Sequence, residues 1–144
     1  MKKKLVLVFS FCLFILSSFA QKTEVFSNDE GAIKGYDAVA YFKVGKATKG
    51  NSSFAYQWKD AKWLFESQEN LDAFKAMPEK YAPQYGGYCA FGLSENHKSP
   101  TTPEAFTIVN DKLYLNYNAK VKELWLKDKE SRIIKADSNW VQIK

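Results

Sequence analysis

The sequence predicts an α+β domain, in which a small antiparallel sheet of four to five strands packs with two to three helices, including a C-terminal helix. Two pairs of short, aromatic-rich segments alternate apolar and polar residues and are separated by polar turns, which is the pattern of β-hairpins. Segments of helical period begin after Ser67 and Asn118, residue types that cap helices. Strands and helices in this combination indicate the α+β class.

The N-terminus has the composition of an export signal. Three lysines precede an apolar run over residues 5–16, and the small residues Ser18 and Ala20 suit the subsites of a signal peptidase. The run is shorter than the ~20 apolar residues that span a bilayer, and Cys12 lies inside it, which disfavours a retained anchor and a lipoprotein. We therefore predict a signal peptide over residues 1–20, cleaved near Ala20, a periplasmic or secreted product, and no stable membrane insertion after cleavage.

Residues 21–144 contain no repeat, low-complexity segment or long linker, and we expect them to form a single domain. The whole chain has 21 Lys and Arg residues against 16 Asp and Glu residues, but three of the lysines belong to the predicted signal. The remaining lysines are dispersed and form no block that could bind phosphates. The charge pattern therefore predicts a solvated surface and no nucleic-acid partner.

The first part of the predicted domain contains an irregular segment, a strand and a hairpin. Residues 21–31 are polar, and we expect them to be frayed. Residues 36–44 have the pattern of a short strand, with three candidates for burial, Val39, Tyr41 and Phe42. Residues 54–58 and 63–65 then predict a hairpin whose strands are joined by a polar turn over residues 59–62.

Helical segments are expected after this hairpin. Ser67 is placed to cap a helix that ends at Pro78 and has apolar positions at Leu71, Phe74 and Met77. A further helical turn is expected over residues 79–81. The glycine-rich segment 85–92 has neither the helical nor the strand period and is the least ordinary part of the chain.

A second hairpin and a terminal helix complete the predicted fold. Residues 105–109 and 113–117 flank Asn110 and Asp111, a pair that tolerates the positive φ of a two-residue turn. Asn118 then caps the terminal helix. The apolar face of that helix is marked by Val121, Leu124, Trp125 and either Ile133 or Ile134.

Several motifs occur along the chain in a fixed order: segments 35–42, 63–67, 78–81, 85–91 and 136–140, with Phe74 between the second and third. Together they resemble the YHS domain family, and the resemblance covers nearly all of residues 21–144. More closely, the chain is similar to exported YHS domain-containing proteins of Gram-negative bacteria. The resemblance implies a fold related to small metal-binding modules, some of which belong to proteins that handle heavy metals.

The chain departs from the metal-binding members of that family at the positions that matter most. Where those members carry cysteines, on the first strand and at the strand-to-helix corner, this chain has Ala40, Glu66 and Asn70. The Tyr-His-Ser triplet of the family is best matched by residues 56–58, Tyr-Gln-Trp, so its histidine is missing as well. The usual soft-metal cluster is therefore absent.

Cys89 and His97 are the only thiol and the only imidazole in residues 21–144, and a segment able to turn separates them. A thiolate and an imidazole together favour Cu(I) or Zn(II), and a linear, two-coordinate geometry favours Cu(I). Zinc needs four ligands, so Asp37, Glu95 or a tyrosine hydroxyl would have to join the pair. We predict that Cys89 and His97 bind a soft transition metal, a copper ion ahead of zinc or iron.

Other residues are candidates to contact the bound group. Tyr36, Asp37 and Tyr88 are the predicted cofactor-binding residues, although Asp37 could instead cap the turn before the strand. The alternative to the metal site is that Cys89 is a small buried residue and His97 a loop residue that faces solvent. Under that alternative the partner is an unidentified protein or a small ligand.

The abundance of aromatic residues, which make up 16% of the chain, supports the alternative of a protein- or small-ligand-binding module. Some of them are expected to line a groove, because tyrosine and tryptophan combine a large apolar surface with a polar tip. The rings in question are Tyr36, Tyr41, Tyr56, Trp58, Trp63, Tyr85, Tyr88 and Phe91. The competing interpretation is that these rings form the core.

We predict no enzymatic activity. His97 would have to serve every nucleophile–base scheme, and no second cysteine in residues 21–144 could resolve an oxidised Cys89. The pair Gly86 and Gly87 neither follows a plain strand nor leads to a Lys-Ser or Lys-Thr pair, so no phosphate-binding loop is indicated. The function expected from the sequence is therefore binding.

Overall fold

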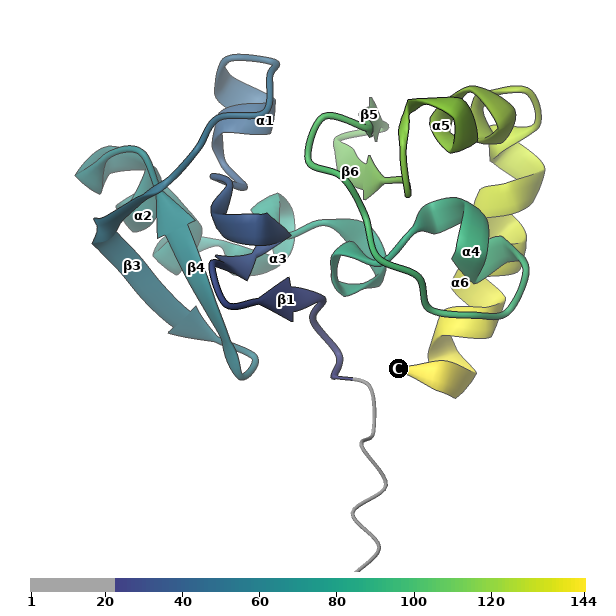
Figure 1. The fold of residues 1–144 in the computed structure, drawn as a ribbon, viewed down its shortest axis with the longest axis horizontal. Helices are drawn as coiled ribbons and strands as arrows, with labels where there is room; N and C mark the ends of the chain where they lie inside the picture. The colour runs from purple at the N-terminus through teal and green to yellow at the C-terminus, as the bar shows by residue number, and fades with distance from the viewer. Residues whose placement is uncertain (1–22) are drawn as a thin grey trace, which may run out of the picture.

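The structure of the protein, a computed structural model, describes residues 23–144. The predicted signal peptide over residues 1–20 thus lies outside the described residues. The described chain is a mixture of helices and short antiparallel strands, and its longest helix, α6 (Lys129–Ile143), runs along one side of the molecule (Figure 1). The α+β character predicted from the sequence is confirmed. No helix among residues 23–144 is long and apolar enough to cross a membrane.

The predicted single sheet of four to five strands is wrong. Within residues 23–144 the strands form three separate two-stranded sheets, and in each of them the two strands are consecutive in the chain. The pairs are β1 (Ser27–Asn28) with β2 (Gly31–Ala32), β3 (Asn51–Trp58) with β4 (Ala61–Phe65), and β5 (Phe106–Val109) with β6 (Lys112–Leu115). The strands are short. No strand of one pair forms a backbone hydrogen-bonded ladder with a strand of another pair among the described residues.

Both predicted hairpins are present and use the same kind of turn. Lys59 and Asp60 have φ values of 49° and 57°, and Asn110 and Asp111 have values of 50° and 58°. Positive φ at both central residues matches the right-handed twist of the flanking strands, so two residues are enough to close each hairpin. The first turn is therefore shorter than the four-residue turn that the sequence predicted.

The strand predicted over residues 36–44 is wrong. After the 3₁₀ turn η1 (Ile33–Gly35), the chain forms a short helix, α1 (Ala40–Lys43). Asp37 causes the difference, because its Oδ1 accepts hydrogen bonds from the backbone N–H groups of Val39 at 2.8 Å and Ala40 at 3.2 Å. The segment 21–31, expected to be frayed, contains β1 and begins β2, and Val25 within it is buried.

The predicted caps are confirmed. The Ser67 hydroxyl accepts from the Asn70 N–H at 3.2 Å and begins α2 (Gln68–Ala76), which is followed by α3 (Pro78–Tyr81). Asn118 accepts from the Val121 N–H at 2.9 Å and begins α5 (Ala119–Leu126). The predicted single terminal helix is two helices, because the helix is interrupted at residues 127–128 before α6 begins.

The apolar face predicted for the terminal segment is only partly buried. Trp125 is fully buried, and Ile133 rather than Ile134 packs on the core. Ile134 and Leu124, in contrast, are 71% and 41% exposed. The prediction treated residues 118–143 as one continuous helix with a single apolar face. Because α5 and α6 are separate helices, that assumption assigned the wrong exposure to Leu124 and to Ile134.

Two hydrophobic clusters meet at β6. The N-terminal core gathers residues from Val25 to Ala82, around Phe74, together with Leu113 and Leu115. The C-terminal core lies under α6 and consists of Tyr85, Tyr88, Ala90, Leu93, Tyr114, Trp125 and Ala136. Because side chains alternate along a strand, Tyr114 of β6 faces one core and its two leucine neighbours face the other. This strand holds the two halves seen in Figure 1 together.

Candidate functional site

The chain reaches Cys89 through the tight turn η2 (Gln84–Gly87), in which Tyr85 and Gly86 have φ values of 58° and 63°. A side chain at position 86 would collide with the carbonyl of Glu24, and the Gly86 carbonyl accepts a 2.9 Å hydrogen bond from the Phe26 N–H. Only glycine allows this close approach together with a positive φ. The turn thus ties the N-terminal segment to the chain immediately before Cys89.

Cys89 caps the short helix α4 (Ala90–Ser94) and is 2% exposed. Its Sγ accepts from the Gly92 N–H at 3.5 Å and donates to Oδ1 of Asn116 at 3.6 Å. Its backbone N–H donates to the Ser99 carbonyl at 3.0 Å. The thiol is therefore held in one orientation by groups from both sides.

Burial raises the pKa of the Cys89 thiol above its ordinary value. The backbone N–H groups of Gly92, Tyr117 and Phe91 face the sulfur and act in the opposite direction, because they stabilise a negative charge there. The effect of burial is larger than that of the N–H groups, so the thiol is protonated at neutral pH. A protonated thiol is a poor nucleophile, which argues against covalent catalysis by Cys89.

His97 lies just beyond the end of α4. Its backbone N–H donates to the Gly92 carbonyl at 3.0 Å, and its Nδ1 is 3.4 Å from the Glu95 carbonyl. Its Nε2 lies 3.3 Å from the point where a Cβ on Gly92 would stand. Nε2 and the sulfur of Cys89 therefore approach the same small residue, and the side chain of His97 is exposed.

Cys89 and His97 line one pocket of about 310 Å³. The other lining residues are Phe91, Gly92, Ser99, Tyr117 and Val121, so the walls are mostly apolar. The sequence predicted that the thiol and the imidazole could meet across residues 90–96, and the turn after α4 brings them to the same cavity. The buried thiol and the exposed imidazole thus belong to residues that line one pocket.

The pair has no further ligands of the kinds that zinc prefers. Nowhere in residues 23–144 do three or more His, Cys, Asp or Glu side chains gather in a way that could hold a metal ion. Glu95, considered as a third ligand, is paired with Arg132 at 2.9 Å. Two protein donors suit a linear Cu(I) centre and leave a tetrahedral zinc site incomplete.

Asp37 does not line this pocket. It is fully buried, and besides the N–H groups of α1 its carboxylate accepts from the Glu66 N–H at 2.9 Å and from Nδ2 of Asn70 at 2.7 Å. The sequence left open that Asp37 caps the turn before a strand, but that strand does not form, and Asp37 caps the start of α1. It also joins the start of α1 to the corner between β4 and α2.

Tyr36 and Tyr88 also lie outside the Cys89 pocket. The hydroxyl of Tyr36 donates to Glu104 at 3.2 Å on the surface. Tyr88 is nearer, since it lines a neighbouring pocket of about 230 Å³ that shares Ser99 with the Cys89 pocket. Its hydroxyl donates to the Thr23 carbonyl at 2.9 Å.

Asn116 is the residue at this site that the sequence analysis missed. It is fully buried, and its Oδ1 accepts from both the Cys89 thiol and the Phe91 N–H, the latter at 3.1 Å. Its Nδ2 has no hydrogen-bond partner among the described residues. Asn116 follows β6 and lies 27 residues after Cys89, so no local sequence pattern links the two residues. The feature that could have identified Asn116 is its position as a polar residue directly after an apolar strand.

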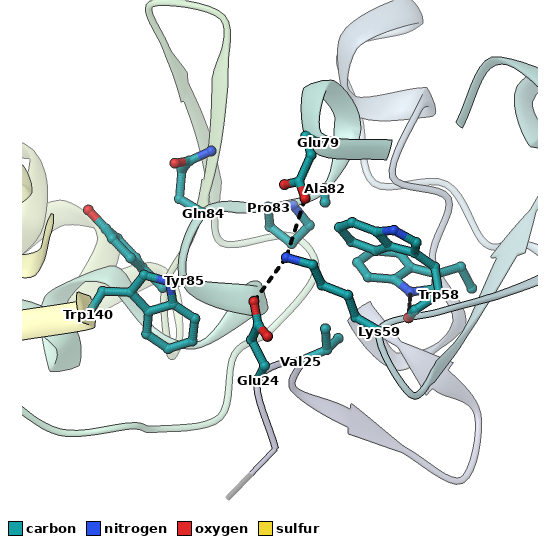
Figure 2. Close-up of a pocket in the computed structure, with 12 residues that line it drawn as sticks. Glu24, Val25, Trp58, Lys59, Glu79, Ala82, Pro83, Gln84, Tyr85 and Trp140 are labelled. Carbon is teal, nitrogen blue, oxygen red and sulfur yellow. Dashed lines mark hydrogen bonds and ion pairs between the residues drawn. The ribbon is translucent and has the colours of Figure 1, made fainter. Parts of the chain in front are cut away.

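The aromatic residues divide between the core and a second pocket. Tyr41, Trp63, Tyr85 and Tyr88 are buried, whereas Trp58 and Phe91 are half-buried. Trp58, Tyr85 and Trp140 are among the residues that line a cavity of about 120 Å³. In Figure 2 Trp58 lies on one side, and Tyr85 and Trp140 lie on the other. Both interpretations made from the sequence, core and groove, thus describe some of the rings.

We expect Cys89 to react slowly with a bulky aromatic disulfide in the folded protein, because the thiol is buried and its pKa is raised. The measurement is the second-order rate constant on the chain from Gln21, in which Cys89 is the only cysteine, at pH 7.5 with and without denaturant. The denatured chain is the control. Equal rates in the two conditions would show that the thiol is freely accessible.

Comparisons with models of known protein families, with curated proteins and with solved structures found no match. The resemblance to the YHS family therefore stays a prediction from the motifs. The functional argument has to be made from the pocket itself.

Proposed function

We propose that the chain is an exported YHS-like binding protein without enzymatic activity, and that it binds a soft transition-metal ion, Cu(I) ahead of zinc or iron, through Cys89 and His97. The observation that carries the proposal is that these two residues line the same pocket and that both side chains lie close to Gly92. They combine the thiolate and imidazole donors that Cu(I) prefers.

The surroundings of the sulfur support a metal thiolate. When the ion binds, it replaces the thiol proton, which passes to solvent. The N–H groups of Phe91, Gly92 and Tyr117 then face a sulfur that carries negative charge, and the walls of the pocket around it are mostly apolar. A thiolate no longer donates to Oδ1 of Asn116, which keeps the Phe91 N–H as its donor.

The test is Cu(I) competition against a chromophoric chelator under anaerobic conditions, on the chain from Gln21. We expect one Cu(I) per protein, no retention by Cys89→Ser, and an affinity at least about 100-fold lower for His97→Ala, since a ligand should cost at least as much as an outer-shell partner. Tyr36→Phe, which removes a surface hydroxyl outside the pocket, is the control and should bind as the wild type does.

Two results would contradict the proposal: failure of the wild-type protein to take Cu(I) from the chelator, or equal affinity of the wild type and Cys89→Ser. Either would favour the alternative, an aromatic-lined module for a protein or small ligand in which Cys89 is structural. The pocket in Figure 2 is the observation that favours this second candidate.

A further inference from the structure

The position of His97 depends on how α4 ends. The helix closes with a Schellman motif, in which the Asn96 N–H donates to the Leu93 carbonyl at 3.1 Å. In the second hydrogen bond of the motif, the His97 N–H donates to the Gly92 carbonyl at 3.0 Å. Asn96 has a φ of 62°, a left-handed conformation that asparagine tolerates. The motif turns the chain back over the helix, which places the imidazole of His97 beside Gly92.

The helix that carries this turn is too short to hold itself. α4 has five residues, fewer than a helix needs to be stable without packing. It packs against α6, as Figure 1 shows. Nδ2 of Asn139 on α6 donates to the Leu93 carbonyl of α4 at 2.8 Å. The turn that carries His97 is therefore held in place through the contact between α4 and α6.

Arg132 of α6 contacts the last turn of α4. Its Nη1 donates to Oγ of Ser94 at 2.8 Å and to Oε1 of Glu95 at 2.9 Å. Its Nε donates to Asp128 at 2.7 Å, and its Cζ lies 3.8 Å from the centroid of the Phe91 ring. The side chain is only 17% exposed. A planar guanidinium can stack on a ring and form these hydrogen bonds at the same time, whereas an ammonium group cannot.

Two of the residues that Arg132 contacts belong to the surroundings of the candidate site. Phe91 lines the Cys89 pocket. The backbone carbonyl of Glu95 lies 3.4 Å from Nδ1 of His97. Arg132 itself does not line the pocket, so any influence that it has on a ligand there passes through these neighbours.

We propose that Arg132 is a positioning residue, which holds the last turn of α4 so that the imidazole of His97 stays at the Cys89 pocket. Its expected effect on Cu(I) rests on the proposed function. The position of the imidazole does not, because it can be measured without any metal.

The first measurement is NMR on the metal-free chain from Gln21. His97 is the only histidine, so the two carbon-bound protons of its ring are identified without ambiguity. We expect NOEs from this ring to the Cα protons of Gly92, because Nε2 lies 3.3 Å from the point where a Cβ would replace one of them. These NOEs should be lost in Arg132→Ala.

The matched control is Lys129→Ala. It removes a cation from the same helix, but the ion pair of Lys129 is with its neighbour Glu130, at 2.7 Å. This variant should keep the NOEs between His97 and Gly92. The comparison separates the contacts of Arg132 with α4 from the loss of one positive charge.

The second measurement is the Cu(I) affinity by chelator competition. Arg132→Ala should lower it about tenfold, the low end of the range for residues that orient metal ligands. In the His97→Ala background the same substitution should change the affinity by less than about twofold, because no imidazole remains to be positioned. Arg132→Lys keeps the charge without the planar fork and should lie between Arg132→Ala and the wild type. Lys129→Ala should bind as the wild type does.

Two outcomes would overturn the inference: His97–Gly92 NOEs that are unchanged in Arg132→Ala, or an equal loss of Cu(I) affinity with and without His97. If Arg132→Ala did not fold, Arg132→Lys would decide, since unchanged NOEs and affinity in that variant would show that the guanidinium is not required. A wild type that takes up no Cu(I), together with NOEs that depend on Arg132, would contradict the proposed function and support the positioning role.

Discussion

Replacing Asp37 by alanine is expected to lower the free energy of unfolding by at least about 3 kcal/mol, because four donors lose their acceptor inside the protein. These donors are the backbone N–H groups of Val39, Ala40 and Glu66 and the side-chain amide of Asn70, at 2.7–3.2 Å from the carboxylate oxygens. Asp37 itself has no exposed surface. Water cannot easily replace it, so most of the lost hydrogen bonds stay unmade.

The effect should be measured by urea denaturation followed by tryptophan fluorescence. Asp72→Ala is the control, since Asp72 is exposed on α2 and its side chain accepts from Gln68 four residues earlier; we expect a change within about 0.5 kcal/mol. Asp37→Asn should fall between the two, because it keeps an acceptor oxygen but turns an NH₂ group toward other donors. A midpoint for Asp37→Ala equal to that of Asp72→Ala would refute the structural role.

Replacing Phe74 by alanine is expected to cost about 3–5 kcal/mol, which is the usual range for removing a fully buried phenylalanine. The Phe74 ring is at the centre of the N-terminal core, and its centroid lies 4.9–6.3 Å from those of Tyr56, Trp58, Trp63 and Phe65. Its loss would leave a cavity that these large, rigid rings cannot close, because they are held by both strands of the β3–β4 hairpin.

Thermal unfolding by circular dichroism measures this prediction, with Met77→Ala as the control. Met77 ends the same helix and is 49% exposed, so its truncation should have a small effect. Phe74→Leu should lose less than Phe74→Ala, since most of the volume is kept. If Phe74→Ala unfolded at the same temperature as Met77→Ala, the aromatic cluster could not be the main source of stability in this half.

The elements that the sequence predicted well are those that depend on neighbouring residues. The turn pair 110–111 closes its hairpin as predicted, and the side chains of Ser67 and Asn118 reach the N–H groups three residues later. In each case the decisive interaction spans fewer than five residues. Local propensity and capping chemistry are then sufficient, and the structure agrees with them.

The elements that the sequence mispredicted depend on distant partners. Residues 36–44 alternate as a strand would, but Asp37 is held by Glu66 and Asn70, 29 and 33 residues away, and this anchors a helical turn in place of a strand. The prediction that strands of different hairpins pair into one sheet was wrong for a related reason. Alternation shows which face of a strand is apolar, but it does not show whether a helix or another strand will cover that face.

The candidate site divides in the same way. The sequence alone determined which groups are available, because residues 21–144 hold one thiol and one imidazole, Cys89 and His97. Only the tertiary structure decided that they share a pocket, that Asn116 reaches the sulfur from the end of β6, and that Trp58 and Trp140 line a separate cavity. Donor chemistry is a property of single residues, whereas a cavity exists only where segments far apart in the chain pack side by side.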